Sequence, residues 1–191
     1  NILVEEIYLF FLVYQNLSFV FPYYKNNYLR KKSLSKKNVR NIRTVIDVVN
    51  YEKKNLREYD YVLLLHCTSP IRVKNSLNNA LKNFYKSKCD SAVSVSQGIK
   101  KKDNFICEIK NNNLKIQENN FYKKKLHFFN AAIYITKPEL LKKNFTFINK
   151  KIFPIVQSNV ESVDINFLED FKLAETLIKS KKINISIPKK I

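Results

Sequence analysis

The sequence predicts an α/β fold: a mostly parallel, Rossmann-like sheet flanked by helices, with a small antiparallel hairpin insert. Tyr61–Leu65 is a continuous apolar run of strand length, as is typical of a parallel strand buried on both faces. A helix-spaced stretch over 76–85 and an apolar run over 92–95 follow it, which completes a βαβ pattern. Residues 111–113 are three asparagines between two apolar runs, and asparagine tolerates the positive φ of a hairpin turn.

Hydrophobic periodicity places the remaining elements. We predict strands over 4–14, 105–109, 114–116, 131–136 and 152–156, and helices over 39–51, 138–143 and 166–180. Pro138 suits the first turn of its helix. For the last helix we predict an N-cap at Asn166 with Glu169 three residues later. Its apolar residues are expected to face inward: Phe167, Phe171, Ala174, Leu177 and Ile178.

Composition supports one domain over residues 1–191. The chain has 191 residues, 45% of them hydrophobic and 27% charged, which allows a sizeable core and argues against disorder. One glycine excludes a collagen-like chain, and three widely spaced cysteines exclude a disulfide scaffold. The apolar run near the N-terminus is interrupted at Gln15, Asn16 and Ser18, so it is too short for a membrane span. We therefore expect a cytoplasmic protein with free thiols and no membrane partner.

The formal net charge is +19, with 30 Lys against 5 Arg. Nucleic-acid surfaces usually use arginine for bidentate contacts, so we interpret the lysines mainly as solvated faces and do not expect nucleic acid as a partner. A polyanion-binding surface is the alternative. The single glycine, Gly98, cannot supply a glycine-rich phosphate loop, so nucleotide chemistry would depend on side chains or on a segment that is missing.

Two polar segments are candidate sites. Residues 66–72 follow a predicted strand, where ligands bind in open α/β sheets. The alternative is a loop in which Thr68 and Ser69 cap a helix beginning near Pro70; a Cys67–His66 nucleophile pair is less favoured, because adjacent side chains at a strand end point apart. Residues 162–166 alternate so that Ser162, Asp164 and Asn166 share one side. The oxygens of Asp164 and Asn166 can bind Mg²⁺, although an N-cap role is the simpler interpretation.

Five segments of the chain are similar to motifs of one enzyme family. Residues 59–72 are similar to the motif LLQPTSPLR, and 130–135 (NAAIYI) to the motif NGAIYI. Residues 163–175 (VDINFLEDFKLAE) resemble the ending IDIDTxEDFxLAE, and residues 34–50 and 90–96 resemble two further segments. Together, and in the same order, these five segments resemble the acylneuraminate cytidylyltransferases, the CMP-sialic acid synthetases.

The resemblance implies a nucleotide-diphospho-sugar transferase-like fold, and a homodimer is possible. It also implies transfer of CMP from CTP to a sialic-acid-like (nonulosonic) sugar with release of pyrophosphate, assisted by Mg²⁺; sialic, legionaminic and pseudaminic acids are equally compatible. It assigns the following residues: Asp164 and Asn166 to catalysis and metal, Arg30 and Asn41 to the nucleotide, His66, Asn130 and Tyr134 to the sugar, and Thr68, Ser69 and Arg72 to the loop that shapes the pocket.

The sequence also departs from the family. Asn166 replaces the second metal aspartate and Ala131 replaces the glycine of NGAIYI. Nothing matches the glycine- and lysine-containing phosphate loop, so we expect a domain lacking that N-terminal strand and helix. Residues 9–28 fit the family poorly, which a local reading-frame disturbance would explain. The alternatives are a catalytically impaired pseudoenzyme, a basic nucleotide- or polyanion-binding domain, or a gene remnant that folds poorly.

Overall fold

The computed structural model describes residues 7–11, 31–36, 38–55, 59–73, 75–97, 106–117 and 126–180, and it confirms the α/β class. Its sheet has the strand order β1 (Ile7–Phe11), β2 (Tyr61–Leu65), β6 (His127–Thr136), β3 (Ser91–Ser96) and β7 (Ile152–Gln157). A hairpin of β4 (Ile106–Lys110) and β5 (Asn113–Gln117) continues from the start of β6. The helices are α1 (Asn41–Lys54), α2 (Ser76–Ser87), α3 (Pro138–Asn144) and α4 (Leu168–Lys179), with a 3-10 turn η1 (Lys32–Leu34).

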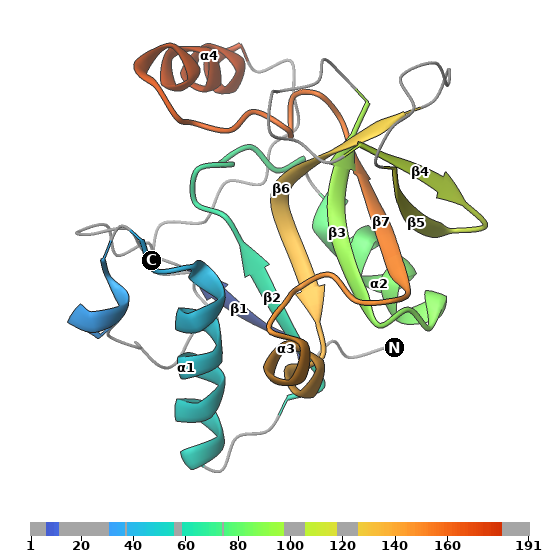
Figure 1. The fold of residues 1–191 in the computed structure, drawn as a ribbon. Helices are drawn as coiled ribbons and strands as arrows, with labels where there is room; N and C mark the ends of the chain where they lie inside the picture. The colour runs from blue at the N-terminus through green and yellow to red at the C-terminus, as the bar shows by residue number, and fades with distance from the viewer. Residues whose placement is uncertain are drawn as a thin grey trace.

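Of the five strands in this order, four run in one direction and β6 runs against them. β1 is parallel to β2, and β3 is parallel to β7, whereas β6 pairs antiparallel with both β2 and β3. The predicted βαβ unit is therefore present, but its two strands are not neighbours because β6 lies between them (Figure 1). Local apolar patterns predict strands, whereas strand order depends on pairing between distant segments.

Alternation along β2 explains why helices cover both faces of the sheet. Val62 and Leu64 pack in one apolar cluster with α1 and α3. Leu63 and Leu65 pack in a second cluster with α2. All four side chains are almost fully buried, as expected of a strand enclosed on two sides. α1 and α3 lie on one face of the sheet and α2 on the other (Figure 1).

The hairpin forms at the predicted asparagines. Asn111 and Asn112 have φ values of 50° and 56°, which asparagine tolerates better than most residues. Asn113 begins β5, and its Oδ1 accepts a 2.9 Å hydrogen bond from the N–H of Ile152. The hairpin is therefore fastened to β7 as well as to β6.

α4 begins later than predicted and has a different cap. The helix begins at Leu168, and the carboxylate of Asp170 accepts hydrogen bonds of 3.0 Å from the N–H groups of Asn166 and Phe167. The predicted N-cap at Asn166 with Glu169 as its partner was wrong. Asp170 lies one residue closer to the helix interior, where it reaches both N–H groups at the start of the helix.

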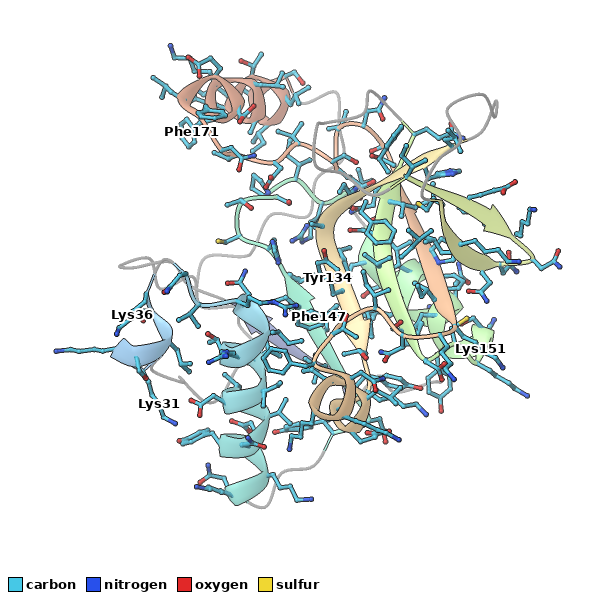
Figure 2. The ribbon with its side chains drawn as sticks, viewed as in Figure 1. Lys31, Lys36, Tyr134, Phe147, Lys151 and Phe171 are labelled. Carbon is cyan, nitrogen blue, oxygen red and sulfur yellow. The ribbon has the colours of Figure 1, made fainter. Side chains whose placement is uncertain are left out.

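The prediction that α4 turns an apolar face inward was also wrong. Within α4 only Ala174 is buried, whereas Phe167 and Phe171 are 73% and 53% exposed, Ile178 is exposed and Leu177 is half-buried. The helix lies beyond the ends of the strands (Figures 1 and 2). Periodicity predicts that a helix has an apolar side, but not that another element covers it.

The three cysteines are free thiols, as predicted. Cys67 is exposed, Cys89 is half-buried, and burial raises the pKa of Cys107 to about 12. In the part of the chain that the structure describes, no helix combines the length and the apolar character needed to cross a lipid bilayer.

Candidate functional site

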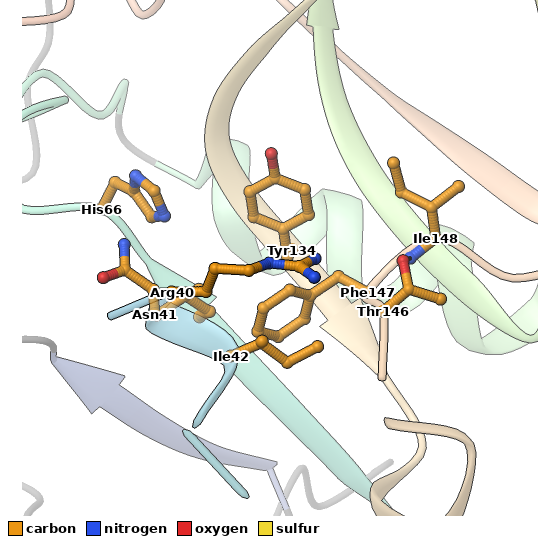
Figure 3. A pocket seen from close by; sticks show the side chains of 9 residues that line it. Arg40, Asn41, Ile42, His66, Tyr134, Thr146, Phe147 and Ile148 are labelled. Atoms are coloured by element: carbon orange, nitrogen blue, oxygen red, sulfur yellow. Dashed lines mark hydrogen bonds between the residues drawn. The ribbon is translucent and has the colours of Figure 1, made fainter. Parts of the chain in front are cut away.

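A pocket of about 250 Å³ opens at the carboxyl end of β2. It lies between the start of α1, β6 and the loop that follows α3 (Figure 3). Its lining residues are Arg40, Asn41, Ile42, Leu64, His66, Tyr134, Thr146, Phe147 and Ile148. This is the edge where an open α/β sheet binds its ligands, as the sequence predicted for residues that follow β2.

Aromatic rings form the back of the pocket. The ring centroids of Tyr134 and Phe147 are 5.2 Å apart, and those of His66 and Tyr134 are 5.8 Å apart. Burial raises the pKa of Tyr134, so its hydroxyl stays protonated near neutral pH and can donate a hydrogen bond. Such a surface suits a ring-shaped ligand with hydroxyl groups.

Positive charge lies on the other side of the pocket. Arg40 precedes α1, and Asn41 and Ile42 are its first two residues, so the positive end of the helix dipole lies at the pocket. Arg40 also places its guanidinium carbon 5.4 Å from the ring centroid of Phe145. Arg43, one turn further along, does the same at 5.9 Å. An anionic ligand is favoured at this side.

His66 is held as a neutral imidazole at pH 7. Burial lowers its pKa, Asp164 opposes that effect, and Arg72 adds to it. The backbone N–H of His66 donates to the carbonyl of Ala132 at 3.1 Å, which fixes the residue where β2 ends. A neutral imidazole can donate from one nitrogen and accept at the other, as recognition of a sugar hydroxyl requires.

The loop after His66 is shaped by its own polar groups. Ser69, which is buried, donates its N–H to the carbonyl of His66 at 3.3 Å, and Nη2 of Arg72 donates to the same carbonyl at 3.3 Å. α2 begins only at Ser76, so the alternative in which Thr68 and Ser69 cap a helix near Pro70 was wrong. Burial lowers the pKa of Arg72, although the guanidinium remains charged at neutral pH.

Asp164 lies in irregular coil and Asn166 in a bend, rather than on one face of an extended strand. The Nδ2 of Asn166 donates to the Oδ2 of Asp164 at 2.9 Å, so the two side chains meet, and Asp164 is half-buried. The N–H of Ile165 donates to the carbonyl of Thr68 at 2.7 Å, which joins this segment to the loop after β2.

Asp164 and Asn166 are the two side chains of this segment that could hold one divalent cation. Mg²⁺ is commonly bound through one or two carboxylates, with water and substrate phosphates as its other ligands. Asp164 supplies a carboxylate, and rotation of the Asn166 amide would turn its oxygen to the same place. No cluster of three or more His, Cys, Asp or Glu able to hold a metal occurs among the described residues.

Asn130 donates from Nδ2 to Oε1 of Gln157 at 2.9 Å and to Oγ of Ser162 at 2.8 Å, and it does not line the pocket. It therefore supports the segment that carries Asp164. Arg30 lies outside the described residues.

Sequence reasoning missed much of the pocket lining. Arg40 and the segment of Thr146, Phe147 and Ile148 were not singled out. The aromatic residues after α3 were the available signal, but a loop has no periodicity that shows which way its side chains point.

The sequence matches no protein-family model and no curated protein. Solved structures with a similar fold were found. One is CMP:2-keto-3-deoxy-manno-octonic acid synthetase complexed with CTP, with a TM-score of 0.51, 8% identity, and coverage of 73% of this chain and 68% of that chain. Another is assigned as a glucose-1-phosphate thymidylyltransferase from Bacillus anthracis in complex with sucrose, with a TM-score of 0.54, 10% identity, and coverage of 80% and 65%.

The chain has the fold of these nucleotidyltransferases. It spans about two thirds of the length of each of the two structures. At this level of identity the likeness concerns the fold, whereas a reaction depends on the residues of the site.

Proposed function

We propose that this protein is a cytidylyltransferase that transfers CMP from CTP to a sialic-acid-like (nonulosonic) sugar and releases pyrophosphate. The observation that supports this most is the composition of the pocket at the end of β2. It combines an aromatic wall, a neutral imidazole and a cationic rim, and the segment that carries Asp164 is bonded to the loop that forms one side of it.

The size of the pocket limits what it holds. Its volume of about 250 Å³ lies just below the roughly 300–1,000 Å³ of ordinary ligand sites. It therefore fits one ring, and we assign that ring to the sugar. Tyr134 and Phe147 contact the ring, His66 binds a hydroxyl, and Arg40 attracts the sugar carboxylate.

The nucleotide is assigned to the rim near α1. Asn41 and Ile42, whose N–H groups begin α1, line this side together with Arg40. Helix N-termini favour phosphate groups, and basic side chains add to the attraction. In this assignment, side chains and one helix N-terminus bind the phosphates, which glycine-rich loops bind in other nucleotide-binding proteins.

The reaction forms one bond to phosphorus and breaks another. The sugar hydroxyl oxygen attacks the α-phosphorus of CTP, the bond from that phosphorus to the bridging oxygen of the β-phosphate breaks, pyrophosphate leaves, and the hydroxyl proton is released to solvent. Asp164 and Asn166 would hold a Mg²⁺ ion, which neutralises triphosphate charge when bound. The residues of the chain contribute mainly by orienting the two substrates.

Thermal stability tests nucleotide recognition. CTP at 100 times its dissociation constant should stabilise the fold by about 2.7 kcal/mol, a rise in Tm of roughly 5–10 °C for this size. We expect this rise with CTP and Mg²⁺, little with ATP, and retention in 0.5 M salt. Asp164→Ala should remove the Mg²⁺-dependent part of this rise. Glu139→Gln, which changes an exposed carboxylate in the first turn of α3, should not.

A second function, that of a basic nucleotide- or polyanion-binding domain without catalysis, has its own support. Asn166 leaves the candidate metal site with one carboxylate, and the chain carries a net charge of +19. In that case all nucleotides would stabilise the fold alike, and the effect would fall steeply as salt is raised. The same salt series therefore separates the two functions.

A further inference from the structure

We propose that Glu161 is a positioning residue that fixes the loop after β2 and the segment carrying Asp164 against each other. The consequence for catalysis rests on the proposed function, whereas the clamp itself can be tested without it. Glu161 is a buried carboxylate, 5% exposed, and it lies outside the pocket lining.

Both oxygens of Glu161 are fully engaged, and each faces a different segment. Oε1 accepts from the N–H of Val73 at 3.2 Å and from Oγ of Ser76 at 2.6 Å. Oε2 accepts from the N–H and the Oγ of Ser158 at 3.3 and 3.1 Å. The carboxylate thus joins the start of α2 to the turn that follows β7, segments more than 80 residues apart in sequence.

The same carboxylate supplies the opposite charge near Arg72. Glu161 raises the pKa of Arg72 against the lowering caused by burial. Arg72 in turn donates to the carbonyl of His66 at 3.3 Å. A buried guanidinium without an opposite charge nearby is costly, so Glu161 stabilises the loop that positions His66.

Asp164 lies three residues beyond Glu161 on the other side of this clamp. Between them Ser162 accepts a hydrogen bond from Asn130, and after them Ile165 donates to the carbonyl of Thr68 at 2.7 Å. Three sets of contacts therefore set the distance between His66 and Asp164: those of Glu161, the bond from Asn130 to Ser162, and the bond from Ile165 to Thr68. Among these contacts, only those of Glu161 involve a carboxylate. A displacement of about 1 Å between reacting groups can reduce a rate about 100-fold.

Amide hydrogen exchange tests the clamp directly. In Glu161→Gln the new NH₂ group cannot accept from the N–H of Ser158, so one segment loses its partner. We expect at least tenfold faster exchange at Val73, Ser158 and Ile165, with the amide of Val93 in the core unchanged. Ser76→Ala, which removes one hydrogen bond, should give a smaller change at the same amides and serves if Glu161→Gln does not fold. Unchanged exchange at these three amides would overturn the proposal, and so would equal acceleration at Val93.

Steady-state kinetics test the consequence. We expect kcat of Glu161→Gln to fall about 10- to 100-fold while KM for CTP changes less than threefold, because each loop still binds but the reacting groups are misplaced. Glu139→Gln is the matched control and should leave both constants unchanged. A rise in KM at constant kcat would overturn the positioning role. If the unaltered chain transfers no CMP, the proposed function fails, and hydrogen exchange alone decides whether Glu161 is the clamp.

Discussion

Ala131 has a φ of 57° in the middle of β6, at the bulge where the pairing of β3 with β6 shifts between Val93 and Val95. Side chains with a Cβ adopt this conformation at a cost of about 1–2 kcal/mol, which glycine avoids. The Oγ of Ser94 accepts the N–H of Ile133 at 2.8 Å and completes the bulge. The positive φ at Ala131 therefore explains why the NGAIYI motif has a glycine at this position.

Ala131→Gly should therefore stabilise the fold by about 1 kcal/mol, measured by urea unfolding. The matched control is Ala132→Gly, since Ala132 is fully buried and is not among the residues with positive φ. It should destabilise the fold, because a strand interior loses entropy and packing with glycine. A loss of stability in both variants would show that Ala131 is not strained.

Burial lowers the pKa of both histidines of the chain, His66 and His127. Below the unfolded pKa of about 6.5 the unfolded state binds more protons than the folded state. Their contribution to stability is thus fully present above about pH 6.5 and is lost as the pH falls below it. The slope reaches at most about 1.4 kcal/mol per pH unit for each histidine.

Urea unfolding of His66→Gln and His127→Gln between pH 7.5 and 5, without Mg²⁺, checks this sign. Below pH 6.5, the unfolding free energy of each variant should decrease less steeply with falling pH than that of the unaltered chain. A variant with the same slope as the unaltered chain would show that its histidine is protonated as easily when folded as when unfolded.

The contact of Asp164 with Asn166 gives a further prediction. In Asn166→Asp two carboxylates replace a hydrogen-bonded pair with atoms 2.9 Å apart, so Tm should fall without divalent cation. With Mg²⁺ the second carboxylate strengthens binding, and the Mg²⁺-dependent rise in Tm should exceed that of the unaltered chain. Asp164→Asn should show no such rise. An equal Mg²⁺ response in all three chains would place the cation elsewhere.

Among the helices and strands, the N-terminal cap of α4 gives a prediction that distinguishes the role of Asp170 from that of Glu169. Asp170→Ala removes the acceptor for two N–H groups and should destabilise the helix by about 1 kcal/mol. The measurement is amide hydrogen exchange, which should be faster along residues 168–179. Glu169→Ala is the control, because its carboxylate has no role in the cap seen here. A larger effect of Glu169→Ala would show that Glu169, and not Asp170, caps the helix.

Most helices and strands were predictable from the sequence because they depend on local patterns. The apolar run of β2 has the predicted bounds, and the asparagine hairpin forms where its turn chemistry places it. The insertion of β6 between β2 and β3 was not predictable, because it depends on pairing between distant segments. The exposed side of α4 was missed for a related reason: nothing in Phe171 itself shows whether another element covers it.

At the scale of the whole molecule, the candidate site is partly a prediction and partly a result of the fold. Asn41, His66 and Tyr134 were proposed from motifs and line one pocket. Phe147 and Arg40 join them only because α1 and α3 pack side by side on the same face of the sheet, which no local pattern contains. Glu161 was missed because a single carboxylate in a polar stretch has no sequence signature of burial.

³¹P NMR of the purified chain with CTP, Mg²⁺ and a nonulosonic acid tests the transfer reaction itself. We expect pyrophosphate and a CMP-sugar phosphodiester to appear in equal amounts, with formation of both lost in Asp164→Ala and retained in Glu139→Gln. Release of phosphate without the sugar adduct, or unchanged CTP under conditions in which CTP raises Tm, would contradict the proposed transfer reaction and favour a nucleotide-binding domain without catalysis.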